Sequence, residues 1–157
     1  MYEESLSLKQ QIRTTWGDQP ETLRDVSVSL ERLAGLEREA GRPEQARLMY
    51  EHALQLRQQV RAELGDQAAT LRDVSISLGH LADLERDAGR PEQARTLYEE
   101  ALTLDQDIRS RWGDQPDTLR DVSFSLGRVA DIDREAGRHD RARSMYEEAL
   151  MLDQQIR

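Results

Sequence analysis

The chain has no cysteine, a single lysine and a single phenylalanine among its 157 residues. Without cysteine it has no disulfide framework, no thiolate ligand for a metal ion and no cysteine nucleophile. No apolar run approaches the roughly 18 residues that a membrane-spanning helix needs, and the start, MYEESLSLKQ, lacks the apolar core of a signal peptide. We therefore expect a cytoplasmic protein without a membrane segment.

Positive charge is also scarce. Asp and Glu outnumber Lys and Arg by 31 to 22, which gives a formal net charge of −9. Such a surface repels phosphate backbones and anionic lipid, so nucleic acid and membranes are not expected partners. Arginine supplies nearly all of the basic residues, and we interpret this bias as the codon usage of a GC-rich, bacterial genome.

What the chain does contain is a repeat. Tyr2, Tyr50, Tyr98 and Tyr146 follow one another at intervals of 48 residues, and several glycines keep the same spacing. Such self-similarity is the signature of an array in which each unit packs on its neighbours. We divide the single domain, 1–157, into a half repeat at 1–15 and full repeats at 16–63, 64–111 and 112–157.

Each repeat is predicted to form two helices. The first follows GDQP, with Asp18 as its N-cap or, one turn later, with a capping box over Thr22–Asp25. Gly41 is placed to end it in a left-handed conformation, and Pro43 starts the second helix. The apolar spacing of the first helix predicts one buried stripe, made of Leu23, Val26, Leu30, Leu33 and Ala34. The sequence thus predicts about seven helices in an all-α solenoid of antiparallel hairpins.

Three segments carry a resemblance to a known family. AGRPEQARLMYEHALQL (40–56), AGRPEQARTLYEEALTL (88–104) and AGRHDRARSMYEEALML (136–152) resemble the second half of a tetratricopeptide repeat. The repeat of 48 residues is longer than the standard one of about 34. It is more similar to the repeats of kinesin light chains and of bacterial arrays found beside signalling ATPase or protease-like domains. The resemblance implies a right-handed superhelix that binds proteins or peptides.

No group of residues predicts catalysis. The histidines, His52, His80 and His139, occupy three different repeat positions, and no pair has the spacing of a helical metal site. Ser27 and Ser29 lie beside an aspartate, as in some hydrolases, but the same Asp-Val-Ser-x-Ser occurs in all three repeats. We expect no enzyme, no cofactor and no metal ion.

One apolar position changes size while its neighbours stay constant: Val28, Ile76 and Phe124. At about 100° per residue it lies opposite the buried stripe, on the face expected to line the concave surface. Its residues either fill gaps between neighbouring first helices or form the apolar floor of a peptide groove. Gly79 and Gly127 share this face at a cost of about 1 kcal/mol each relative to alanine, so a neighbouring helix or a ligand should pack closely there. The candidate binding residues are Arg24, Val28, Arg32, Arg72, Ile76, Gly79, Asp83, Arg120, Phe124, Gly127, Arg128 and Asp131.

Two functions remain open at this point. The first is a non-enzymatic protein-interaction scaffold that binds a peptide or a partner helix on its concave face. The second is a structural or self-assembling module, as a fragment of a longer array or an engineered segment, whose repeats bind only each other. The helices expected at 1–15 and 140–157 have no capping partner, and their apolar faces could join copies into a homo-oligomer.

Overall fold

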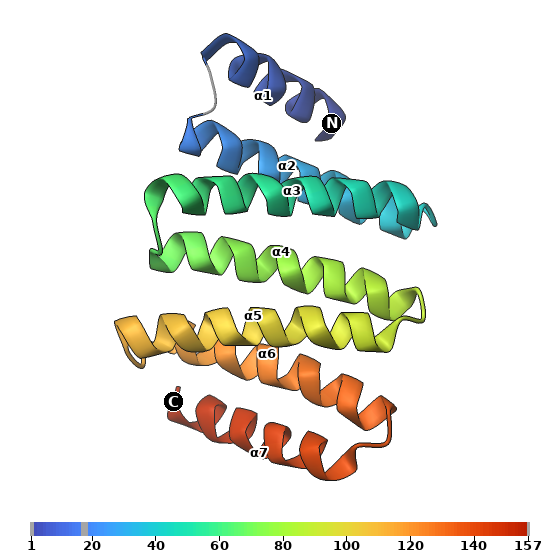
Figure 1. Cartoon of the computed structure of the whole chain (residues 1–157), viewed down its shortest axis with the longest axis vertical. Coiled ribbons are helices and arrows are strands. Elements are labelled where there is room, and N and C mark those ends of the chain that lie inside the picture. The colour runs from blue at the N-terminus through green and yellow to red at the C-terminus, as the bar shows by residue number, and fades with distance from the viewer. Residues whose placement is uncertain (1, 17–18, 157) are drawn as a thin grey trace.

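The computed structural model describes residues 2–16 and 19–156, which form seven α-helices. The helices lie side by side in chain order, each antiparallel to the one before it, with the two chain ends at opposite ends of the stack (Figure 1). Their bounds are α1 (Tyr2–Trp16), α2 (Pro20–Glu39), α3 (Pro43–Leu64), α4 (Ala68–Asp87), α5 (Pro91–Trp112), α6 (Pro116–Glu135) and α7 (His139–Gln155). The predicted all-α array of helical hairpins is confirmed. None of these described helices is long and apolar enough to cross a membrane.

Glycine ends the helices, as the sequence predicts. Gly41 has φ +76 and Gly65 has φ +83, a left-handed conformation that only glycine adopts without strain. At the end of α2 the N–H of Arg42 donates to the carbonyl of Glu37 at 2.9 Å, which closes the helix with a Schellman-type bond. Pro43 then opens α3, because its missing N–H has no partner to lose in a first turn.

The predicted N-caps are wrong or lie outside the described residues. Asp18 belongs to the undescribed segment, and the N-cap of α2 is Gln19, which makes no side-chain capping bond. The capping box over Thr22–Asp25 is wrong because α2 already begins at Pro20, which places Thr22 inside its first turn.

The later repeats show what this threonine does. The Thr70 hydroxyl accepts a hydrogen bond from the N–H of Gln67 at 3.0 Å and donates to the carbonyl of Gly65 at 2.8 Å. It therefore joins the start of α4 to the end of α3. The aspartate of the GDQ turn does not cap the helix but pairs with an arginine, Asp66 with Arg61 at 2.7 Å.

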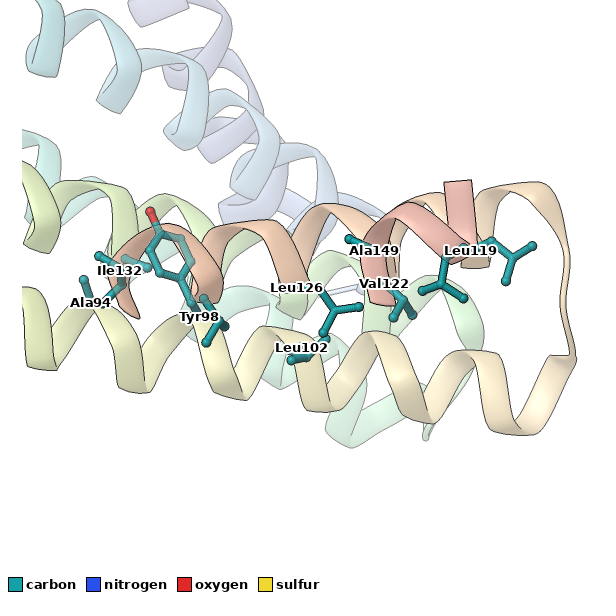
Figure 2. Packing of buried hydrophobic residues seen from close by; sticks show 11 residues of the cluster. Ala94, Tyr98, Leu102, Leu119, Val122, Leu126, Ile132 and Ala149 are labelled. Carbon is teal, nitrogen blue, oxygen red and sulfur yellow. The ribbon is translucent and has the colours of Figure 1, made fainter. Parts of the chain in front are cut away.

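The predicted buried stripe of α2 is confirmed, since all of its five residues are at most 6% exposed. The same positions are buried in α4 and α6, where they pack against the apolar faces of the second helices. Figure 2 shows this packing in the last repeats, where Leu102 of α5 lies beside Leu126 of α6 and Ala149 of α7 lies near Val122 of α6. Each of the helices α2 to α6 is thus packed between the helices that precede and follow it.

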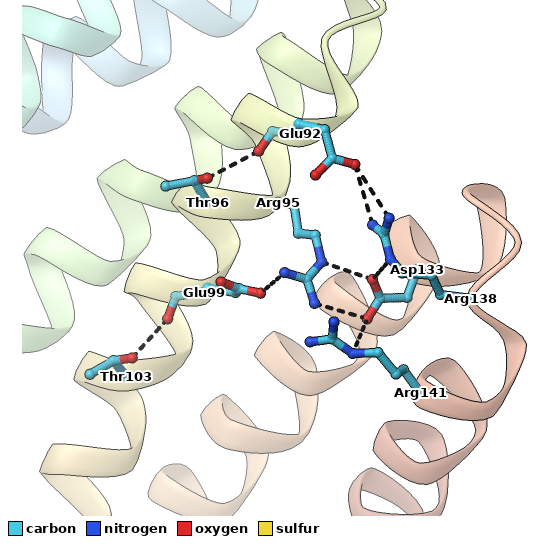
Figure 3. Close-up of polar contacts among 8 residues, drawn as sticks. All are labelled: Glu92, Arg95, Thr96, Glu99, Thr103, Asp133, Arg138 and Arg141. Carbon is cyan, nitrogen blue, oxygen red and sulfur yellow. Dashed lines mark hydrogen bonds and ion pairs between the residues drawn. The ribbon is translucent and has the colours of Figure 1, made fainter.

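Buried ion pairs also hold the repeats together. The Asp133 carboxylate of α6 is fully buried and pairs with Arg95 of the preceding repeat at 2.8 Å and with Arg138 at 2.6 Å (Figure 3). Burial raises its pKa, but the two arginines outweigh burial and hold the pKa below its usual value. At the same position one repeat earlier, Glu85 is 6% exposed and pairs with Arg47. Sequence reasoning did not foresee that these carboxylates would be buried.

Candidate peptide-binding groove

A groove of about 390 Å³ opens between α4 and α6, with α5 beneath it. Its floor includes Tyr98, Ala101 and Asp105 of α5. Seven of the candidate binding residues line it together: Arg72, Ile76, Gly79, Asp83, Arg120, Phe124 and Arg128. The other candidates lie outside its lining: Arg24, Val28 and Arg32 on α2, and Gly127 and Asp131 on α6.

The variable apolar position is exposed in the two repeats that form the groove. Phe124 is 63% exposed and Ile76 is 44% exposed, whereas Val28 is half-buried. A side chain that filled a gap between helices would be buried, so the packing interpretation is wrong for Phe124 and Ile76. The Arg128 guanidinium lies over the Phe124 ring, 4.9 Å from its centre, a cation–π contact that keeps the ring in place on the groove wall.

The helix-interior glycines of this face are open. A Cβ atom added to Gly79 or Gly127 would meet no other heavy atom within 4 Å. Close packing of a neighbouring helix was one of the two explanations expected for these glycines, and it is wrong. In the first repeat, by contrast, a Cβ on Gly35 would lie 3.9 Å from the Tyr50 hydroxyl oxygen. The backbone of α4 and α6 is thus accessible beside the groove.

The arginines expected to contact a ligand are engaged within the chain. Arg24 of α2 pairs with Asp73 of α4 at 2.8 Å, and Arg72 of α4 pairs with Asp121 of α6 at 2.9 Å. These pairs tie each first helix to the next. Arg120 lies on α6, the first helix of the last repeat. It pairs at 3.2 Å with Asp117 of the same helix, and both side chains are largely exposed.

The candidate aspartates hold tyrosine hydroxyls of the second helices. The Tyr98 hydroxyl donates to Asp83, and the Tyr146 hydroxyl donates to Asp131. Burial and the negative charge of Asp83 raise the pKa of Tyr98, so the hydroxyl remains a donor at neutral pH. Asp83 also lies 3.9 Å from Arg128, which places it on the groove wall with its charge compensated.

Sequence reasoning missed one functional candidate, Asp105, at the bottom of the groove. It is 4% exposed and accepts a hydrogen bond from the Ser125 hydroxyl. Burial raises its pKa to about 6, although the hydroxyls of Ser125 and Ser75 oppose the rise. The signal was present in the repeat alignment, because this position carries Arg57 in the first repeat and an aspartate in the next.

His80 and His139 lie on different helices, and the Ser27 hydroxyl is bonded to the backbone. The His80 ring stacks on Tyr50, with the ring centres 5.2 Å apart and the planes 13° apart, while His139 is exposed on α7. The Ser27 hydroxyl is buried and donates to the Arg24 carbonyl at 2.6 Å. Within the described residues, no group of three or more His, Cys, Asp or Glu side chains could hold a metal ion.

Comparison with known proteins gives one family. A family model described as Tetratricopeptide repeat matches residues 25–107 and again 73–155, which together span most of the chain. No curated protein matches the chain in sequence.

Two solved structures are similar over nearly the whole chain. The crystal structure of BtubC (BKLC) from P. vanneervenii aligns with a TM-score of 0.71 and 25% identity, over 98% of this chain. The chain spans about half of that protein, 54% of its length. The crystal structure of the de novo designed helical repeat protein DHR64 aligns with a TM-score of 0.55 and 22% identity, over 99% of this chain and 79% of the designed one. The second likeness concerns the fold alone.

Proposed function

Because the chain belongs to the tetratricopeptide repeat family, we propose that it is a non-enzymatic scaffold that binds a peptide or a partner helix in the groove between α4 and α6. Tetratricopeptide repeats are generally non-catalytic and typically mediate protein–protein interaction. The family thus supports the class of function, and the groove supports the place of binding.

The observation that carries the proposal is the exposure of large apolar side chains beside open backbone. Phe124 and Ile76 stand on the two walls of the groove at 63% and 44% exposure. Large apolar side chains that are exposed in a concave site are typical of a ligand-binding site. Gly79 lines the same groove with nothing above it, although glycine is unfavourable inside a helix. A ligand that packs closely against the α4 backbone would account for a glycine at this position.

Selection from a random peptide library tests the proposal. We expect peptides selected on the native chain to lose at least about tenfold in affinity, or about 1.4 kcal/mol, when Phe124→Arg removes the apolar wall. Leu48→Arg is the matched control, because Leu48 is 67% exposed on α3 and lies outside the groove lining. If both substitutions leave every selected peptide bound with unchanged affinity, the groove is not the binding site.

One observation favours the second candidate, a self-assembling array. Leu102 of α5 is 8% exposed, whereas Leu150, the equivalent residue of α7, is 57% exposed beside Met151 at 60%. An added repeat or a second copy of the chain would cover this face. Light scattering over a concentration series tests it, with Leu150→Glu as the comparison. Growth in mass that this substitution abolishes would support self-assembly, and a constant monomer mass would exclude it.

A further inference from the structure

The first and second repeats differ at two positions, one on each helix of the repeat, that lie close together in the fold. The first repeat carries Glu31 on α2 and Arg57 on α3. The residues 48 positions later are Gly79 on α4 and Asp105 on α5, both in the lining of the groove. At these two positions the groove between α4 and α6 thus has a glycine in place of the glutamate of the first repeat and a carboxylate in place of its guanidinium.

In the first repeat these two residues form a buried ion pair. The Arg57 guanidinium contacts Glu31 at 2.8 Å and donates to the hydroxyls of Ser27 and Ser77 at 3.1 and 3.0 Å. It is 5% exposed and also donates to the carbonyl of Asp73 at 3.0 Å. A guanidinium therefore fits between two first helices of this fold, where hydroxyls and a carboxylate satisfy its donors.

In the second repeat a hydrogen bond to a hydroxyl takes the place of this ion pair among the described residues. Asp105 is bonded to the Ser125 hydroxyl, and no ion pair to it is present among the described residues. The nearby Arg72 pairs with Asp121, and Arg128 lies beside Asp83 and over the Phe124 ring. A carboxylate that is 4% exposed and has no directly bonded cation among the described residues is stabilised when a cation reaches it. Asp105 nevertheless belongs to the lining of the groove.

From this difference we propose that the groove between α4 and α6 receives an arginine side chain of the bound peptide, whose guanidinium pairs with Asp105. The inference rests on the proposed function and names the chemistry of its ligand. Gly79 and Asp105 are smaller than Glu31 and Arg57, and the groove volume of about 390 Å³ falls in the range of small-ligand sites, roughly 300–1,000 Å³. The methylenes of the arginine would lie between Ile76 and Phe124. The net charge of −9 favours the approach of a basic peptide.

Amide NMR titration with a short capped peptide, one arginine among alanines, tests the inference directly. A peptide with citrulline in place of arginine keeps the shape of the side chain without its charge. We expect the arginine peptide to shift the amides of Gly79 and Asp105, and the citrulline peptide to bind at least about tenfold more weakly. Equal binding of the two peptides would overturn the inference.

Three variants and one control locate the guanidinium. Asp105→Asn should weaken the arginine peptide at least about tenfold, whereas Asp107→Asn, on the more exposed side of α5, should not. The double variant Gly79→Glu with Asp105→Arg restores the pair of the first repeat and should fill the groove, so that binding is lost. The reverse double variant, Glu31→Gly with Arg57→Asp, should create a second site between α2 and α4. Unchanged affinity in both Asp105 variants, with melting temperatures showing that they are folded, would overturn the inference.

The two proposals fail in different ways. If library peptides bind through Phe124 but carry no basic residue and are insensitive to Asp105→Asn, the arginine inference is wrong and the scaffold proposal stands. If no selected peptide depends on Phe124, the scaffold proposal itself is wrong at this groove.

Discussion

The Arg95 guanidinium of α5 donates two hydrogen bonds to the buried carboxylate of Asp133 on α6, from Nε to Oδ1 at 2.8 Å and from Nη2 to Oδ2 at 3.3 Å (Figure 3). The two residues belong to successive repeats. Glu85 and Arg47 make the same connection one repeat earlier. The stack is therefore fixed by charged contacts between repeats as well as by its apolar core.

We expect Asp133→Ala to lower the free energy of unfolding by about 3 kcal/mol, because it removes the buried acceptor of Arg95 and Arg138 and leaves them with only the more exposed Glu99 and Glu92. Glu37→Ala is the matched control. Glu37 has the equivalent position in the first repeat but pairs only with Arg42 of its own repeat among the described residues. Urea unfolding measures both, and equal losses would mean that the contact between repeats contributes nothing specific.

Ionisation of the Asp105 carboxyl should lower the stability of the fold, whereas the Asp133 carboxylate raises it. Its pKa is about 6 in the folded chain, above the ordinary 3.8, so its contribution is favourable below pH 3.8 and is lost as the pH rises to about 6. The facing groups act in opposite senses: Arg72 of α4 lowers the pKa, as do the hydroxyls of Ser75 and Ser125, whereas Asp121 of α6 raises it.

The variant Asp105→Asn should therefore raise the free energy of unfolding at pH 7 by up to about 3 kcal/mol, since each pKa unit corresponds to 1.36 kcal/mol. The gain should vanish near pH 4. Unfolding curves of the native and variant chains at both pH values check the prediction. A loss of stability at pH 7 would show that the ionised carboxylate is well accommodated without a ligand.

The helix-interior glycines Gly79 and Gly127 should lower the stability of the fold, and Gly79, which lines the groove, should also favour binding. Gly79→Ala and Gly127→Ala should each raise the free energy of unfolding by about 0.5–1 kcal/mol, because alanine favours a helix and the added Cβ meets nothing. Gly79→Ala should also weaken the selected peptides. Gly35→Ala, outside the groove, should stabilise the helix without affecting binding. Gly41→Ala should instead destabilise, because φ at this glycine is +76. Thermal melts and peptide titrations distinguish these effects.

Much of the fold follows from periodic features of the sequence. The 48-residue repeat, the turn glycines and the apolar stripe through Leu23 to Ala34 predicted the helix order and the core. The same helical geometry placed Ile76 and Phe124 opposite the core, where both are exposed. Helical position alone could not separate a packing residue from a groove residue, because that depends on the distance between α4 and α6.

The polar interior was much harder to predict. The burial of Asp133 and Glu85 does not follow from the local sequence, because an arginine partner of each lies 38 positions earlier, in another repeat. The role of Asp105 emerges only from comparison with Arg57 of the first repeat. That comparison requires knowing that both side chains contact the first helix of the next repeat. The pairing of Arg24 and Arg72 with aspartates of the next repeat could not be predicted, because it depends on how the helices stack.

The most direct measurement of the central claim is an amide NMR map of the chain with a peptide selected from the library. We expect the largest shifts on the two groove walls, at Ile76, Gly79 and Phe124, and their loss with Phe124→Arg. Largest shifts around Leu48 of α3 or Leu150 of α7, with the groove amides unchanged, would contradict the account.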